Sequence, residues 1–119
     1  MLEKNIGNWA YEDTIGGNAK EGCFGKVYKE NQNSEIVTCY LRLISENKQD
    51  NTLYFDYVTK EGIPKGFRPI TTFYHTVGNL NNNRNITLKI NPDGSIQARL
   101  DTDTPSKVNI YALITYPVK

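Results

Sequence analysis

The chain has 119 residues, and its 14 lysines and arginines against 13 aspartates and glutamates leave a net charge of +1. This length suits one domain with a single core, so we expect residues 1–119 to fold as one unit. The balanced charge provides no basic face for nucleic acid, and the apolar stretches are too short for membrane insertion. The polar N-terminus lacks the pattern of a signal peptide and would suit a fragment cut from a longer protein.

Short windows of alternating apolar and polar residues run along the chain, while no long window has helical spacing. We therefore predict an all-β domain, an antiparallel β-sandwich of about seven or eight strands. The predicted strands, in chain order, are Cys23–Lys29, Ile36–Ile44, Leu53–Val58, Ile70–Val77, Ile86–Ile90, Ser95–Leu100 and Val108–Tyr116, with a short edge strand at Trp9–Tyr11.

The strands on either side of Asn91–Gly94 form the clearest predicted hairpin. Proline presets φ for a turn, and the glycine at position 94 supplies a left-handed residue. Alternation in both arms predicts one core face and one solvent face. The expected core residues are Ile86, Leu88, Ile90, Ile96, Ala98 and Leu100.

Two other predicted strands are apolar on both faces. In Ile36–Ile44 the odd-numbered residues are expected to face the core, which leaves Ile36, Tyr40 and Ile44 on the outer side. In Val108–Tyr116 the same alternation leaves Tyr111 and Leu113 on the outer side. Either both strands are covered on both sides within one subunit, or the second face meets another subunit.

The segment Glu61–Pro69 holds two prolines and two glycines within nine residues, which excludes a helix or a central strand. It must be a shaped corner between strands, with Gly66 in a backbone conformation closed to other residues and Phe67 anchored on the core. The corner is followed by a strand, a polar loop, the Asp93-Gly94 hairpin and a closing strand.

This order of parts resembles the C-terminal head domains of phage baseplate and tail-fibre proteins. The corner motif of those heads is matched by Ile63, Pro64, Gly66, Phe67, Arg68 and Pro69, with Lys65 where an acidic residue is common. The resemblance covers residues 36 to 119 well and the first 35 loosely.

The resemblance implies a jelly-roll-like head without enzymatic activity, from a phage or prophage of a Gram-positive host. Such heads assemble in the bacterial cytoplasm as homotrimers and lie at the tail tip or baseplate of the virion. They bind host cell-wall polysaccharide or attach to other baseplate proteins, including the receptor-binding protein. In a trimer of this kind we expect Tyr40, Ile44, Tyr111 and Leu113 at the subunit interface.

Residues suited to catalysis are sparse. Asp101 and Asp103 are interpreted as turn residues, with a calcium site that adds Asp93 as the alternative. Asp56 is expected to be partly buried and paired with Arg42 or Arg68 rather than to act in catalysis.

Because His75 is the single histidine, a serine or cysteine nucleophile would lack the complete set of catalytic partners that it needs. A zinc site would likewise lack enough ligands. Cys23 and Cys39 are expected to be reduced thiols rather than a disulfide. We predict no catalytic residue, cofactor or metal.

Saccharide binding remains compatible with the composition, because aromatic rings stack on sugars and asparagine side chains bond hydroxyls. The candidate ligand residues are Trp9, Tyr11 and Tyr74. The alternative to a phage head is a monomeric carbohydrate-binding module of a glycan-active enzyme, which needs an exposed aromatic row. A small hydrolase is the third and weaker alternative.

Overall fold

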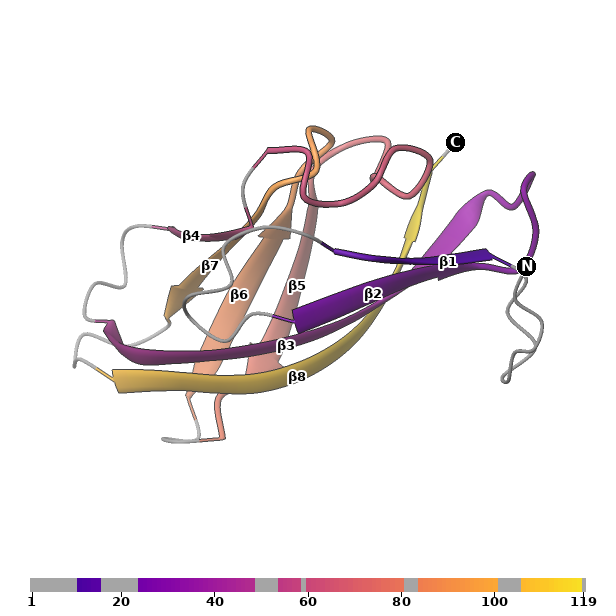
Figure 1. Cartoon of the computed structure of the whole chain (residues 1–119). Helices are drawn as coiled ribbons and strands as arrows, with labels where there is room; N and C mark the ends of the chain where they lie inside the picture. Colours follow the sequence, from indigo (N-terminus) through magenta and orange to yellow (C-terminus); the bar gives the residue numbers. More distant parts are fainter. Residues whose placement is uncertain are drawn as a thin grey trace.

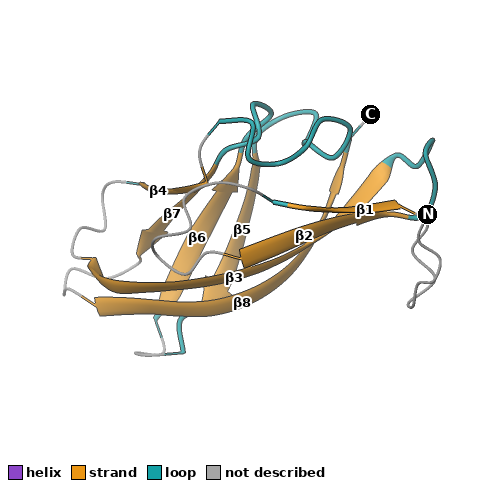
Figure 2. Cartoon of the chain, viewed as in Figure 1, coloured by secondary structure: helices purple, strands orange, loops and turns teal. Residues whose placement is uncertain are grey.

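A computed structural model describes residues 11–15, 24–48, 54–58, 60–80, 84–100 and 106–118. These residues form an antiparallel β-sandwich with two four-stranded sheets, and none of them is helical (Figures 1 and 2). Sheet A has the order β1-β2-β3-β8, and sheet B has the order β4-β7-β6-β5. The strands are β1 (Tyr11–Thr14), β2 (Phe24–Lys29), β3 (Ile36–Lys48), β4 (Phe55–Val58), β5 (Phe73–Gly78), β6 (Asn85–Ile90), β7 (Ile96–Leu100) and β8 (Ser106–Pro117).

The strand order combines a meander with a Greek key. In sheet A, β1, β2 and β3 follow one another and the C-terminal β8 adds to β3, while in sheet B the meander β5-β6-β7 receives β4 beside β7. The all-β sandwich expected from the sequence is therefore confirmed. As in a jelly roll, two four-stranded sheets face each other, and the Greek key lies in sheet B.

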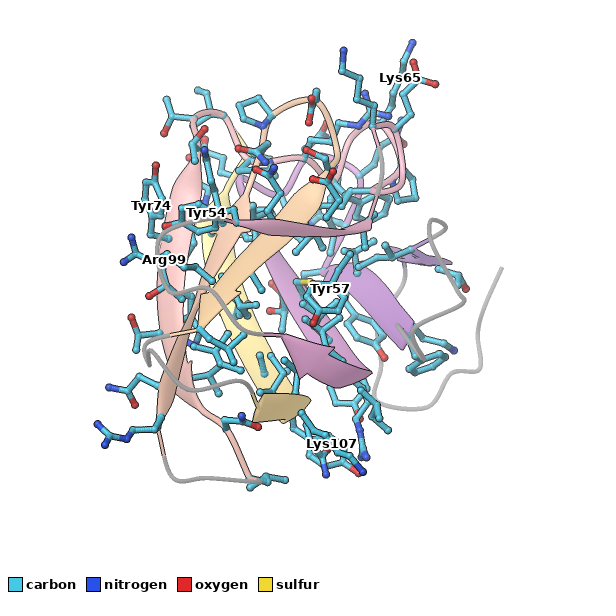
Figure 3. The ribbon with its side chains drawn as sticks, turned by 90° about the vertical axis from the view of Figure 1, so that its left-hand side faces the viewer. Tyr54, Tyr57, Lys65, Tyr74, Arg99 and Lys107 are labelled. Atoms are coloured by element: carbon cyan, nitrogen blue, oxygen red, sulfur yellow. The ribbon has the colours of Figure 1, made fainter. Side chains whose placement is uncertain are left out.

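The core lies between the two sheets, and Figure 3 shows Tyr57 pointing into that space. Alternation explains its composition, because every second residue of a strand faces the same side. All six hairpin residues predicted for the core are buried, at 1% exposure or less. Sheet A contributes the inward positions of β3 and β8, with register pairs such as Cys39↔Ile114 and Leu43↔Ile110.

The sandwich is closed along one side by bonds between β8 and residues that flank β5. Buried Asn79 donates from Nδ2 to the Lys107 carbonyl at 2.9 Å and accepts the Asn109 backbone N–H at 2.9 Å. The N–H of Leu80 also donates to the Asn109 carbonyl, at 2.9 Å. At the other end of β8, the Ile70 N–H donates to the Pro117 carbonyl at 3.1 Å.

Several strand predictions differ from the structure, and the predicted strand Ile36–Ile44 extends to Lys48 as β3. The predicted strand from Ile70 begins at Phe73 instead, because Ile70 is exposed and its N–H bonds to β8. The N-terminal edge strand is Tyr11–Thr14 rather than Trp9–Tyr11. In β4 the register shifts between Asp56 and Val58, which leaves Tyr57 and Val58 both buried.

The predicted corner and the predicted hairpin lie against each other at one end of the sandwich (Figure 1). The Glu61 N–H donates to the Asp93 carbonyl at 2.7 Å, and the Ile63 N–H donates to the Gly94 carbonyl at 2.9 Å. The Ile63 carbonyl in turn accepts a bond from Arg68 Nε at 2.7 Å. These bonds join two segments that the sequence marks separately.

Both glycines expected to adopt special conformations do so. Gly66 and Gly94 have φ of 89°, in the region that other residues rarely enter. Phe67 packs on the core as expected, although it is only partly buried. Its carbonyl accepts the Tyr116 hydroxyl at 2.6 Å, and Lys29 Nζ lies 5.0 Å from its ring centroid.

Candidate functional site

The outer face of sheet A carries a group of apolar side chains that are exposed or partly exposed. We call this surface the apolar face and define it by Phe24, Tyr40, Ile44, Tyr111 and Leu113. Leu113 is 69% exposed and Tyr111 is 51% exposed, although both belong to a strand whose other face is buried core. The register sets Tyr40 opposite Leu113, so the two strands contribute to one surface.

Aromatic contacts connect the members of the apolar face across three strands. Phe24 on β2 meets Tyr40 on β3 edge-on, with ring centroids 6.1 Å apart. Tyr40 meets Tyr111 on β8 at 6.4 Å, and the guanidinium of Arg42 lies 4.0 Å from the Tyr111 ring centroid. This stacking holds the rings in place. The sequence prediction that these strands are apolar on both sides is confirmed, and Ile44, Tyr111 and Leu113 on the outward side are exposed.

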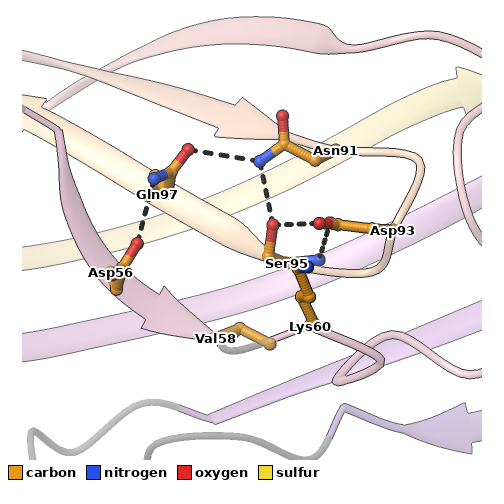
Figure 4. Close-up of a pocket in the computed structure, with 7 residues that line it drawn as sticks. All are labelled: Asp56, Val58, Lys60, Asn91, Asp93, Ser95 and Gln97. Atoms are coloured by element: carbon orange, nitrogen blue, oxygen red, sulfur yellow. Dashed lines mark hydrogen bonds between the residues drawn. The ribbon is translucent and has the colours of Figure 1, made fainter.

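A polar pocket opens where β4, β7 and the β6–β7 hairpin meet (Figure 4). Its volume is about 420 Å³. The residues that line it are Asp56, Val58, Lys60, Asn91, Asp93, Ser95 and Gln97. Among them only Val58 has an apolar side chain, so hydrogen-bonding groups share the pocket wall with the carbon atoms of the polar side chains.

One chain of hydrogen bonds fixes the pocket side chains. The Ser95 hydroxyl donates to Asp93 Oδ1 at 2.6 Å and receives Asn91 Nδ2 at 3.0 Å. Asn91 Nδ2 also approaches Gln97 Oε1 at 3.3 Å, and Gln97 Nε2 donates to Asp56 Oδ1 at 2.9 Å. Ser95 donates from both its hydroxyl and its backbone N–H to Asp93, which lowers the pKa of that carboxyl.

Two tyrosines lie on the outer face of sheet B, the sheet whose strands β4 and β7 line the pocket. Tyr74 on β5 is 57% exposed and stands opposite Lys89 on β6. Lys89 Nζ lies 5.1 Å from the ring centroid of Tyr54, and the guanidinium of Arg99 lies 5.3 Å from it. Figure 3 shows Tyr54, Tyr74 and Arg99 on the same side of the molecule. Lys89 is also the register partner of Gln97. Tyr74, Lys89 and the pocket residue Gln97 therefore lie in one row across the sheet.

The structure separates the residues that the sequence analysis grouped as ligand candidates. Tyr74 lies on the outer face of sheet B, whereas Trp9 is outside the described residues. Tyr11 begins β1, at the edge of the other sheet, and its side chain is not described. Sequence reasoning missed Tyr54 and the pocket residues, because polar side chains around a turn carry no signal until long-range pairing joins them.

The expected burial and pairing of Asp56 are wrong. Asp56 is exposed and bonds to Gln97, because the shift in β4 turns its neighbours inward instead. Arg42 and Tyr111 stack on each other in sheet A, the sheet opposite that of Asp56. Arg68 Nε bonds to the Ile63 carbonyl. Asp56 and Asp93 therefore belong to one polar pocket, a role that the sequence did not suggest.

Several other predictions concern residues that are only partly described. Cys39 is a buried free thiol, while Cys23, Asp101 and Asp103 lie outside the described residues. Within the described part of the chain, no group of three or more His, Cys, Asp or Glu side chains could hold a metal ion. A search of the same residues found no helix with the length and apolar character needed to span a membrane.

No protein-family model matches this chain, and no curated protein sequence matches it.

Proposed function

We propose that the chain is a non-enzymatic head module of a phage tail baseplate or tail fibre, which assembles as a homotrimer and serves attachment. It recognises saccharide of the host cell surface or holds the receptor-binding protein in the virion. The observation that carries this proposal is the apolar face of sheet A. The resemblance of the Ile63–Pro69 corner and the segments after it to phage head domains implies the rest of the proposal: three subunits, a phage origin and a Gram-positive host.

The apolar face supports self-association because its exposure is costly to a monomer. Soluble monomers seldom expose a continuous apolar patch beyond a few hundred square ångströms, and larger patches mark interaction sites. Tyrosine is also favoured at interfaces, because its ring buries apolar area while its hydroxyl finds a polar partner. A second copy that covers Tyr111 and Leu113 removes from water the two side chains at the centre of β8 that the fold leaves outside.

The second candidate function is a monomeric carbohydrate-binding module of a glycan-active enzyme. The outer face of sheet B favours it, because exposed Tyr74 and the nearby Tyr54 lie beside a polar pocket. The two functions differ in oligomeric state: the head requires the apolar face to be buried by other copies, whereas the module functions alone.

The decisive experiment is the mass of the protein in solution. One chain weighs 13.5 kDa, so a homotrimer has a mass of about 40 kDa by light scattering or sedimentation. The double change Tyr111→Ser and Leu113→Ser removes the centre of the apolar face and is expected to give folded monomers. Both side chains point away from the core, so the circular dichroism spectrum should stay that of the wild type.

Two control variants separate loss of the interface from other effects. Ile70→Ser removes an apolar side chain that is equally exposed but lies off the sheets, and Thr115→Ser changes β8 at an exposed polar position. Both variants should remain trimeric. A wild-type protein that is monomeric at micromolar concentration, or a double variant that stays trimeric, overturns the trimer proposal.

A further inference from the structure

The pocket between β4, β7 and the β6–β7 hairpin has the size and the chemistry of a small-molecule site. Its volume of about 420 Å³ lies within the roughly 300–1,000 Å³ of known ligand pockets. Asp56 and Gln97 come from two strands, and Asn91 and Asp93 come from the hairpin (Figure 4). Polar groups from three separate parts of the chain thus converge on one hollow.

The hydrogen-bond network holds these groups in position before any ligand arrives. Each of Asp56, Asn91, Ser95 and Gln97 bonds to at least one other pocket residue. Such bonds limit the side-chain freedom that binding would otherwise remove. Asp56 uses Oδ1 for Gln97, and its other carboxylate oxygen accepts no hydrogen bond from the described residues. Asp56 therefore offers an acceptor on an exposed side chain that is already oriented.

The charges at the pocket are close to balance. Two carboxylates, Asp56 and Asp93, line it with the ammonium group of Lys60, and the guanidinium of Arg68 also acts on Asp93. The pKa of Asp93 is lowered by its bonds from Ser95, so this carboxyl stays ionised at neutral pH. Hydroxyl groups can donate to the two carboxylates and accept from Lys60, whereas a carboxylate or fully ionised phosphate has no proton to donate to them.

Aromatic rings extend the pocket on one side. Tyr54 precedes β4 and lies on the outer face of sheet B, where Lys89 and Arg99 approach its ring. Tyr74 follows on the far side of Lys89 and is exposed (Figure 3). Rings of this kind present flat apolar surfaces against which the C–H face of a pyranose packs. Hydrogen-bond acceptors for hydroxyl groups, together with the exposed ring of Tyr74 and the partly exposed ring of Tyr54, form a combination that suits a neutral sugar.

We propose that this pocket, with Tyr54 and Tyr74 beside it, binds neutral hexopyranose units of a polysaccharide. Vicinal hydroxyls of one unit donate to Asp56 and bond to Gln97, and a neighbouring unit packs against the tyrosines. This inference rests on the proposed attachment function and names its ligand class, but it does not require the trimer. The site lies on sheet B, on the opposite side of the sandwich from the apolar face.

The test is a titration of the full ¹⁵N-labelled chain followed by NMR. The probes are glucose, galactose and mannose and neutral hexose oligosaccharides, with poly(glycerol phosphate) as the anionic comparison. Neutral sugars should shift the amide signals of Asp56, Asn91 and Gln97 before those of the apolar face. Asp56→Ala and Tyr74→Ala should each weaken binding of the best oligosaccharide at least tenfold, with unchanged melting temperatures because both side chains are exposed.

Thr76→Ala is the matched control, because Thr76 is exposed on the same face of β5, two residues from Tyr74. It should bind as the wild type does. If the wild type binds a neutral oligosaccharide and Asp56→Ala binds it equally well, the pocket is refuted while attachment to saccharide stands. Preference for poly(glycerol phosphate) refutes the neutral ligand. If no probe binds at millimolar concentration, the sugar site is refuted, and the trimer proposal is decided separately by mass.

Discussion

Gly94 lies where the hairpin packs against the corner, and its replacement by alanine tests that contact. A Cβ at this position would lie 3.0 Å from both the backbone N and the Cα of Glu61 and 2.9 Å from Arg68 Nε. Backbone atoms cannot rotate away as a side chain can. The hairpin must therefore move from the corner, and the bonds from Glu61 N to Asp93 O and from Ile63 N to Gly94 O lengthen.

The expected cost combines two contributions. Holding alanine at the φ of 89° seen for Gly94 costs about 1–2 kcal/mol. Weakening the two backbone hydrogen bonds adds about 0.5–1.5 kcal/mol for each bond that is lost. We expect Gly94→Ala to lower the free energy of unfolding by about 2–4 kcal/mol, which for a chain of this size lowers the melting temperature by about 8–16 °C.

Two other glycines are built-in controls. Gly66 has the same φ of 89°, but its Cβ would meet only Lys29 Nζ at 3.6 Å, the end of a flexible side chain. Gly66→Ala should therefore cost only the conformational part, about 1–2 kcal/mol. Gly78 has open space around its Cβ position, and its replacement should change stability by less than about 0.5 kcal/mol.

The assay is equilibrium urea unfolding at one fixed protein concentration, because self-association would make stability depend on concentration. The three variants should differ in midpoint and keep the wild-type slope, which reports a similar exposed area on unfolding. If Gly94→Ala costs no more than Gly66→Ala, the close packing of hairpin and corner described here is wrong.

Two further predictions concern single polar side chains. The pKa of Asp93 is lowered in the folded state by its bonds from Ser95, so its stabilising contribution is present above the ordinary aspartate pKa and is lost as pH falls through the lower folded value. Asp93→Asn should therefore show a smaller fall in urea midpoint between pH 6 and pH 3 than the wild type, and an equal fall would contradict the assignment. Asn79→Leu should cost about 2–4 kcal/mol, because two partly buried backbone groups of β8, the Lys107 carbonyl and the Asn109 N–H, lose their partner. A loss below about 1 kcal/mol, measured by the same unfolding assay, would mean that water replaces the amide.

The approximate strands, and the two sides of β3, β6, β7 and β8, could be read from the sequence. Alternation is a local property, because successive residues of a strand point to opposite faces whatever the partner strand is. This is why the core face of the hairpin was predicted correctly. It is also why Tyr111 and Leu113 were placed outside, which is where the structure has them. Glycine conformation is local in the same sense, and both Gly66 and Gly94 have the expected positive φ.

The pocket could not be predicted from the sequence, because its residues are brought together only by the tertiary structure. Asp56, Asn91 and Gln97 are separated in the sequence by up to 41 residues, and they meet only because β4 pairs with β7 beside the turn that follows β6. The register shift in β4, which sends Tyr57 and Val58 inward and leaves Asp56 exposed, likewise follows from pairing with a distant strand.

Short-range sterics and alternation thus determined approximately which residues form strands and, outside β4, which side they face. Strand order, register and the contact between corner and hairpin were decided by long-range packing. Many pairings of the same strands satisfy the local pattern, and the burial of one shared core selects among them.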